Sequence, residues 1–344
     1  MKRPLMLATC PANFGEGGLG QHLARVREDA LARGFDVQVC CHGGIDSPLV
    51  VGKTWEKRLF RLPPFRHRPD LAVWLRHVVF DRRTASRMGA ADEVTAFMGG
   101  ALETFRRARR LGAGKLVLEM PNSHPENVRE LHARARALHP LEPSWMGPLF
   151  SRRVCAEMLL ADEIRVNSEY TARTAVDRGC DPAKLVRRHL PVHPRFSSLR
   201  RVPASDGTRT AVFVGSFTVF KGVPLLVDAF RQVRGEHLRL VLVGGWSSRG
   251  MRVFLESARR SDPRIRWLSG DPAPALSSAE IAFHPSWEDG WGYAPAEALA
   301  AGVPVVVSDQ TGMKEIVRDG LGRILAAGDP AVWNAAVREW GEAA

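Results

Sequence analysis

Apolar residues are grouped along the chain in short runs, and each run is followed by a polar loop and a segment with helical spacing. Such runs are typical of buried strands in a parallel sheet, and the segments between them are typical of helices that cover the sheet. The predicted strands are residues 5–9, 35–41, 115–120, 164–166, 211–215, 239–244, 265–268, 281–284 and 303–309. Strands and helices alternate in both halves, which predicts doubly wound α/β sheets with ligands at the carboxyl ends of the strands.

The predicted helices fill the intervals between these strands, and one interval is a linker. In the first part of the chain, they are a helix ending near residue 33, a helix at residues 71–80 and a basic helix within residues 97–112. Further along, Ser168 caps a helix that opens at Thr171, one helix ends near residue 230 and another starts at residue 294. The last two are a helix containing Glu315 and a short helix before residue 344. Residues 199–210 are rich in turn formers. The pattern therefore predicts an amino-terminal domain of residues 1–198 and a carboxy-terminal domain of residues 199–344, with residues 45–95 the hardest to assign.

The most informative stretch is PSWEDGWGYAPAEALAAG, residues 285–302. Residues 287–292 form a predicted turn, because Gly290 and Gly292 give the backbone freedom and leave N–H groups accessible. A helix follows, with Pro295 in its first turn and Gly302 at its end. A glycine turn before a helix N-terminus presents unpaired donors and a partial positive charge, so this turn is a candidate phosphate site.

Charged side chains near this turn extend the candidate site. Asp289 precedes the glycines and Glu297 lies inside the helix. Since carboxylates repel phosphate, we expect both acids to bind hydroxyl groups of a sugar or ribose. Lys221 follows the strand at 211–215, where its ammonium would face a diphosphate at the mouth of the sheet. The glycines after the first strand, Gly15, Gly17, Gly18 and Gly20, form a second candidate phosphate loop, although their spacing matches no specific fingerprint.

These residues resemble the signature of the family-4 retaining glycosyltransferases, also described as glycosyl transferases group 1. That family has two acids separated by seven residues, as Asp289 and Glu297 are here. It more often has Glu at the first position, and it usually has Arg after the glycine at Gly215, where this chain has Ser216. The resemblance implies the GT-B fold, in which two Rossmann-like domains face each other across a cleft. Relatives usually continue beyond the last helix of this chain with a segment that braces the first domain.

The resemblance also implies a role for each candidate residue. Asp289 would hold the donor sugar, Glu297 the ribose, and Lys221 the leaving diphosphate. His124, at the end of the strand at 115–120, would lie near the reacting carbon. The remaining predicted donor-binding residues are Gly17, Gly18, Gly215, Ser216, Gly244, Gly290, Trp291, Gly292 and Tyr293. No Asp-x-Asp metal site is present in the sequence, and in this family positive groups replace a metal.

The net charge of +12 lies entirely in the first half. Residues 1–200 contain 33 Lys and Arg against 21 Asp and Glu, whereas residues 201–344 contain 16 of each. A basic domain beside a neutral one predicts an anionic partner, such as a phosphorylated acceptor or a lipid headgroup surface. Arg-rich composition with a solvated surface is the competing interpretation. Nucleic-acid binding is disfavoured because no known motif accompanies the charge.

Composition places the chain among reduced globular proteins. Its 344 residues are 45% hydrophobic, no apolar run approaches a membrane span, and the odd number of cysteines, five, has no metal-ligand spacing. The apolar stretch at the amino terminus is too short for a secretory signal. We therefore expect a cytoplasmic protein that can associate with the inner face of the membrane through its basic first half.

Together these features predict a retaining, metal-independent glycosyltransferase of hexosyltransferase type. It would use a UDP- or GDP-sugar as substrate, with no cofactor, and a glycan or lipid-linked acceptor. Bacterial envelope polysaccharide or lipopolysaccharide biosynthesis is the preferred pathway. Two alternatives remain: a binding protein with a degenerate donor site, which Ser216 makes possible, and a nucleotide-sugar epimerase, which would need further acid and base groups.

Overall fold

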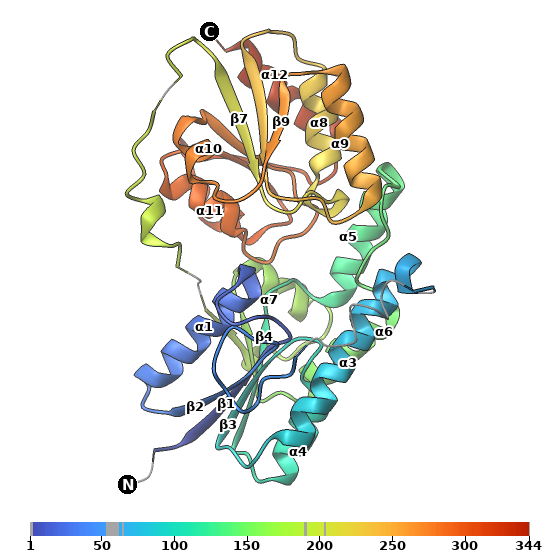
Figure 1. The fold of residues 1–344 in the computed structure, drawn as a ribbon, viewed down its shortest axis with the longest axis vertical. Coiled ribbons are helices and arrows are strands. Elements are labelled where there is room, and N and C mark those ends of the chain that lie inside the picture. The colour runs from blue at the N-terminus through green and yellow to red at the C-terminus, as the bar shows by residue number, and fades with distance from the viewer. Residues whose placement is uncertain (1–2, 53–61, 64, 189–190, 203, 344) are drawn as a thin grey trace. The chain divides into compact units, whose positions relative to one another are not determined.

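A computed structural model describes residues 3–52, 62–63, 65–188, 191–202 and 204–343. The chain forms two compact units (Figure 1). The first comprises residues 1–129, 143–167 and 171–190, and the second comprises 130–142, 168–170 and 191–344. The second unit therefore includes two short pieces from the first half of the chain, 130–142 and 168–170. A single cut in the sequence does not describe this division.

The first unit is built on a parallel sheet in the order β2-β1-β3-β4-β5-β6. Its strands are β1 Leu5–Thr9, β2 Asp36–Cys40, β3 Glu93–Phe97, β4 Lys115–Met120, β5 Glu163–Val166 and β6 Leu185–Arg187. Its helices are α1 Gly17–Ala32, α3 Pro69–Arg87, α4 Leu102–Arg110, α6 Pro148–Leu160 and α7 Glu169–Val176, with α5 Pro125–Leu138 and α7 shared between the units. Short 3-10 turns are η1 Phe65–His67 and η2 Pro182–Lys184.

The second unit repeats this architecture with a parallel sheet in the order β12-β11-β10-β7-β8-β9. Its strands are β7 Arg209–Val214, β8 Leu238–Val243, β9 Ile265–Leu268, β10 Ile281–His284, β11 Val305–Ser308 and β12 Gly322–Leu325. Its helices are α8 Val223–Arg231, α9 Arg249–Ser261, α10 Ala273–Ser278, α11 Tyr293–Ala300 and α12 Pro330–Glu342, with 3-10 turns η3 Pro194–Phe196, η4 Val219–Lys221 and η5 Gly312–Glu315. The two-sheet α/β prediction is confirmed.

The central strands are largely buried because helices cover both faces of each sheet. In β7, residues Ala211 to Phe213 are inaccessible to solvent, and Val305 and Val307 of β11 are equally buried. Burying a valine or phenylalanine side chain stabilises the fold by about 1.5–3 kcal/mol. This burial explains why short apolar runs, rather than alternating patterns, marked the strands in the sequence.

Several boundaries differ from the predictions. The helix after the first strand begins at Gly17, so Gly17 and Gly18 lie in its first turn rather than in a loop. The helix predicted at 71–80 extends over Pro69–Arg87, and Glu315 lies in a 3-10 turn rather than a helix. The elements β3, α5, α6, α9, α10 and β12 were not predicted individually. Part of the weakly patterned region, residues 53–61 and 64, lies outside the described residues.

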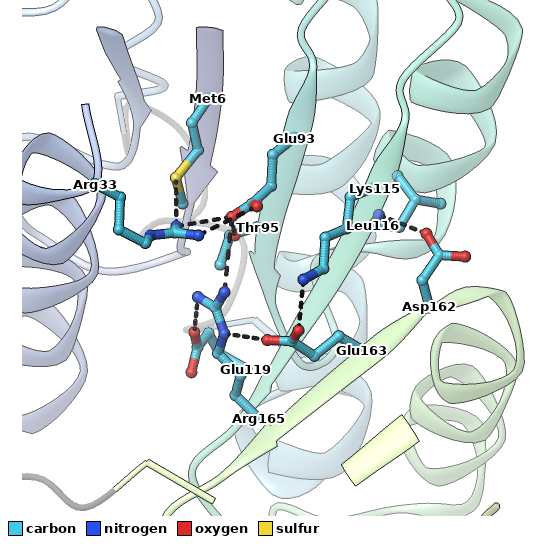
Figure 2. A network of polar contacts seen from close by, with 10 residues as sticks. All are labelled: Met6, Arg33, Glu93, Thr95, Lys115, Leu116, Glu119, Asp162, Glu163 and Arg165. Atoms are coloured by element: carbon cyan, nitrogen blue, oxygen red, sulfur yellow. Dashed lines mark hydrogen bonds and ion pairs between the residues drawn. The ribbon is translucent and has the colours of Figure 1, made fainter. Parts of the chain in front are cut away.

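A buried network of charges crosses the first sheet (Figure 2). The guanidinium of Arg165 on β5 lies 2.6 Å from the carboxylate of Glu163, 3.3 Å from Glu119 and 3.7 Å from Glu93. Glu93 also pairs with Arg33 at 3.0 Å. Breaking a buried pair leaves an uncompensated charge, so these contacts favour one register of β3, β4 and β5. Sequence periodicity did not predict this network.

Candidate functional site

The turn after β10 is held by the segment that follows β11. The Asp289 N–H donates to the Gln310 carbonyl at 3.0 Å, and the Gly312 N–H donates to the Asp289 carbonyl at 3.1 Å. A Cβ at Gly312 would lie 2.4 Å from the Gly290 carbonyl oxygen, so only glycine permits this approach. Gly292 has a φ of +92°, which also favours glycine. The backbone of the predicted turn is therefore fixed on both sides.

Asp289 lies at the centre of a cluster of three side chains. Its Oδ2 atom is 2.7 Å from the Lys221 ammonium and 3.1 Å from Nε2 of His284. The Lys221 ammonium also donates to the Glu288 carbonyl at 3.3 Å. The side chains of Asp289 and Lys221 remain 21% and 28% exposed, so a ligand can reach both.

The sheet topology explains why these residues meet. Lys221 follows β7 and Asp289 follows β10, and these strands are neighbours at the point where the strand order reverses. The Lys221 N–H donates to the Thr218 hydroxyl at 3.0 Å, which closes the 3-10 turn η4. Gly222 then allows close contact with the next loop, since a Cβ there would lie 2.0 Å from the Pro285 carbonyl oxygen. The two loops are thereby locked together at the carboxyl edge of the sheet.

The electrostatics of the cluster keep Asp289 ionised. Burial acts to raise the pKa of the Asp289 carboxyl, but the Lys221 charge and the His284 contact outweigh burial and hold that pKa well below its usual range. Burial lowers the pKa of His284 in spite of its contact with Asp289, so the imidazole is mainly neutral at pH 7. The cluster thus presents a permanent carboxylate beside an ammonium.

His284 was not identified from the sequence. It is the last residue of β10 and is 4% exposed. It precedes the predicted acid Asp289 by five residues. A polar residue closing an otherwise apolar strand was the available signal. That signal is weak, because polar residues at strand ends are common.

The second predicted acid, Glu297, lies on α11 and is outside the cluster of Lys221, His284 and Asp289. Burial raises the pKa of Glu297 to about 7, while Arg195 lowers it and Asp271 raises it further. Helix α11 begins after Gly292, and no side chain caps its N-terminus. The Ala296 N–H in the first turn of α11 donates to the Gly292 carbonyl at 3.2 Å.

The predicted glycines after β7 and β8 hold the two loops against each other. A Cβ at Gly244 would lie 2.0 Å from the Gly215 carbonyl oxygen. The Gly215 N–H donates to the Val243 carbonyl at 2.9 Å. Ser216 is exposed, and Trp246 beyond Gly244 is 39% exposed. Gly215 and Lys221 both follow β7, and Gly244 follows the neighbouring strand β8. The two loops therefore lie at the same edge of the sheet as Lys221.

Two residues from the first half of the chain belong to the second unit and contact the site loops. The Ser168 hydroxyl donates to the Gly290 carbonyl at 2.6 Å, and the Tyr170 N–H donates to Glu315 Oε1 at 2.9 Å. Both contacts lie within the second unit. The segment 168–170 therefore helps to fix the turn that carries Asp289, which the sequence did not reveal.

Three predicted residues belong to the first unit. Gly17 and Gly18 are exposed at the start of α1, where Glu16 provides no side-chain cap, and both have open space where a side chain would project. His124 is 5% exposed, its Nδ1 accepts from the Glu126 N–H at 3.3 Å, and its Nε2 lies 3.9 Å from the Cys155 sulfur. The ring of His124 therefore bonds the first turn of α5.

Within the described residues, no group of three or more His, Cys, Asp or Glu side chains is arranged to hold a metal ion. In the same part of the chain, no helix combines the length and apolar character needed to cross a membrane.

The fold has clear counterparts among solved structures. A solved structure of WaaG, a glycosyltransferase involved in lipopolysaccharide biosynthesis, aligns with a TM-score of 0.67 at 16% identity, covering 98% of this chain and 90% of WaaG. The Anabaena protein HepE, solved with UDP-glucose, aligns with a TM-score of 0.64 at 16% identity, covering 99% of this chain and 90% of HepE. The fold is thus that of the GT-B glycosyltransferases, as predicted.

The sequence comparisons find similarity over part of the chain. Residues 208–342, which include Lys221, Asp289 and Glu297, match the model of the family described as Glycosyl transferases group 1. The D-inositol 3-phosphate glycosyltransferase of Corynebacterium kroppenstedtii is 30% identical over 215 residues, 55% of this chain and 48% of that protein. The chain spans about half the length of the curated relatives it matches. The predicted resemblance to group 1 glycosyltransferases is confirmed.

Proposed function

We propose that this protein is a retaining glycosyltransferase that moves a sugar from a UDP- or GDP-sugar to a glycan or lipid-linked acceptor. The observation that carries the proposal is the Asp289 carboxylate, held by Lys221 and His284 shortly before the N-terminus of α11. This arrangement lies within the region that matches the group 1 family. Sugar hydroxyls and a diphosphate need opposite charges close together, and the cluster offers both.

The donor would be bound by separate groups for each of its parts. Asp289 accepts hydrogen bonds from sugar hydroxyls, while Lys221 and the N–H groups of residues 290–293 bind the diphosphate. Glu297 binds the ribose. Gly17 and Gly18 contribute N–H groups from the first unit, and the loops at Gly215, Ser216 and Gly244 seat the rest of the nucleotide. HepE was solved with UDP-glucose, which supports testing UDP-sugars first.

Transfer would break the bond between the anomeric carbon and the diphosphate oxygen and form a bond from that carbon to the acceptor oxygen. The departing diphosphate gains negative charge, which Lys221 and the α11 N-terminus stabilise electrostatically. The acceptor hydroxyl gives its proton to the leaving phosphate, on the same face of the sugar, so that anomeric configuration is retained. Because protein groups supply the positive charge, we propose that turnover needs no metal, and that activity persists in a chelator.

The acceptor is proposed to carry phosphate. The excess of basic residues in the first half supports this, as does the name of the Corynebacterium relative, a D-inositol 3-phosphate glycosyltransferase. A role in envelope polysaccharide or lipopolysaccharide assembly at the inner membrane face is supported by the fold shared with WaaG. His124 is proposed to face the reacting carbon.

The experiment that tests the proposal is a thermal-shift screen against UDP, GDP, ADP, TDP and their sugar conjugates without added metal. A ligand that binds only the folded state raises the melting temperature, and a 100-fold excess over Kd is worth about 2.7 kcal/mol. We expect one nucleotide class to stabilise the protein, and its sugar conjugate to be hydrolysed slowly or transferred. No shift with any nucleotide at millimolar concentration would contradict the proposal and favour a degenerate binding protein.

A further inference from the structure

A pocket of about 330 Å³ lies between α3 and α4 of the first unit, and arginine side chains dominate its lining. Figure 1 shows these two helices packed side by side on one face of the sheet. The lining residues are Arg82, Ala85, Ser86, Glu103, Arg107 and Arg110. A cavity of this size accommodates a small ligand or headgroup.

The three arginines of the pocket differ from their neighbours in lacking an acidic partner. Arg106 pairs with Glu103 at 3.0 Å, and Arg109 pairs with Asp162. Within the described residues, Arg82, Arg107 and Arg110 form no ion pair. Glu103, the single acid of the lining, is already bound by Arg106, which leaves the pocket strongly cationic.

The identity of the cations indicates the class of ligand. A guanidinium presents a planar set of donors that binds a phosphate through two parallel hydrogen bonds, and clusters of arginine are typical of phosphate recognition. All three arginines are exposed, so the free protein does not pay the desolvation penalty of burying their charges. A compact anion with several acceptor oxygens would be surrounded by donors from two helices.

The pocket is separate from the candidate donor site. Helix α4 starts after the carboxyl end of β3, and Arg110 is its last residue, shortly before β4 begins at Lys115. Arg107 and Arg110 therefore lie toward the amino ends of the strands, away from the carboxyl edge. The donor residues around Asp289 belong to the other unit.

We propose that Arg82, Arg107 and Arg110 form a phosphate-ester site in the first unit, distinct from the nucleotide site. The phosphate is carried either by the headgroup of an anionic lipid or by a soluble phosphorylated compound. The site anchors such a group toward the amino ends of the strands in the first sheet, and it accounts for part of the basic excess of the first half. The proposal does not depend on the glycosyltransferase activity.

The test compares binding by the full-length protein and by the Arg107→Gln/Arg110→Gln variant. One arm measures sedimentation with vesicles of phosphatidylcholine alone and with 30 mol% phosphatidylglycerol. The other arm titrates glycerol 3-phosphate by calorimetry. We expect the double variant to lose roughly 10-fold or more in affinity in the arm that shows binding, because each charged hydrogen bond is worth at least about a factor of 10.

Arg152→Gln provides the matched control. Arg152 is an exposed arginine on α6 of the same unit, outside the pocket lining. Binding that survives in Arg152→Gln but falls in the double variant supports the site, and the arm in which it occurs identifies the source of the phosphate. Absence of binding in both arms would overturn the proposal. It would also be overturned if Arg152→Gln and the double variant lost the same affinity per charge removed. Unchanged stabilisation by nucleotides in the double variant separates this result from failure of the donor site.

Discussion

The loop after β3 in the first unit and the loop after β10 in the second are equivalent in topology but opposite in chemistry. Each follows the strand that lies next to the first strand of its sheet where the order reverses, and each contains glycines before a helix. In the first unit, Glu157 accepts from the N–H groups of Gly99, Ala101 and Leu102 at 2.5, 3.0 and 3.1 Å.

The N-terminal N–H groups of α4, the helix after this first loop, are bonded by side chains of the same unit. Asp81 accepts from the Glu103 and Thr104 N–H groups at 2.7 and 2.9 Å, and Arg153 pairs with both Asp81 and Glu157. In the second unit, α11 has no side-chain cap, and Asp289 is turned toward Lys221 and His284. The comparison teaches that similar glycine turns place their carboxylates differently. Asp81 and Glu157 accept from backbone N–H groups in the first unit, whereas Asp289 pairs with the side chains of Lys221 and His284 in the second.

The largest effect is expected from emptying the closed loop. Asp81→Ala leaves Arg153 and two α4 N–H groups short of a partner, and breaking a buried pair costs about 3–5 kcal/mol. We expect the free energy of unfolding of the first unit, measured by chemical denaturation, to fall by that amount. Glu103→Gln, at an exposed pair, is the control and should change it by less than about 1 kcal/mol. A loss below 1 kcal/mol in Asp81→Ala would show that the loop is not closed by this acid.

The next effect concerns the open loop. Asp289→Ala removes the proposed sugar-binding carboxylate, and loss of an interaction that orients a substrate can reduce kcat/KM about 100-fold. We expect that reduction in transfer or donor hydrolysis. Affinity for the bare nucleoside diphosphate should be retained, because Lys221 is freed to bind phosphate. Equal weakening of the sugar nucleotide and the bare nucleotide would contradict the separate roles of Asp289 and Lys221.

Replacing the ammonium tests the other half of the cluster. Lys221→Ala should weaken UDP or GDP binding by about 10- to 100-fold, the range for hydrogen bonds to charged groups. Calorimetric titration measures this, with Arg318→Gln, an exposed cation of the same unit, as the control. An unchanged affinity in Lys221→Ala would remove its assigned role.

A smaller effect is expected from pH. With a pKa of about 7, Glu297 is mainly protonated at pH 6 and mainly ionised at pH 8. If its carboxylate accepts the ribose hydroxyls, affinity for UDP-glucose should rise severalfold between these pH values. Arg195 and Asp271 are the charged groups acting on it. In the absence of ligand the sign is opposite: the folded state holds the extra proton, so unfolding free energy falls as pH rises from about 4.5 to 7.

Glu297→Gln is the control for both parts of the pH prediction. The variant cannot ionise at this position, so the rise in UDP-glucose affinity should disappear and the fall in stability should become shallower. A rise of the same size in Glu297→Gln would assign the titration to another group.

The smallest effect is expected at the rim of the charge network in the first sheet. Lys115 pairs with Glu163 at 2.6 Å, but its side chain is 42% exposed. Lys115→Met should therefore change the free energy of unfolding by less than about 1 kcal/mol. Arg165→Met, at the buried centre of the same network (Figure 2), should cost several times more. Similar losses in both variants would show that burial does not control these pairs.

Much of the fold followed from local sequence. The strand predicted at 281–284 is β10, and the turn before α11 was identified from Gly290 and Gly292. Elements without a distinctive local pattern were missed. The strand β3 contains Glu93, whose charge makes the segment look less buried than it is, because its partners Arg33 and Arg165 are distant in sequence.

The sequence by itself determined the α/β class. It also identified Asp289, Glu297 and Lys221 as candidate site residues, because strand periodicity and motif spacing are local properties. Only the tertiary structure decided that Lys221 and His284 share one oxygen of Asp289, that Ser168 supports Gly290, and that the similar loop after β3 is closed by Asp81 and Glu157. The physical reason is that pairing and burial depend on which loops the sheet order brings together. Partners far apart in sequence leave no local signal.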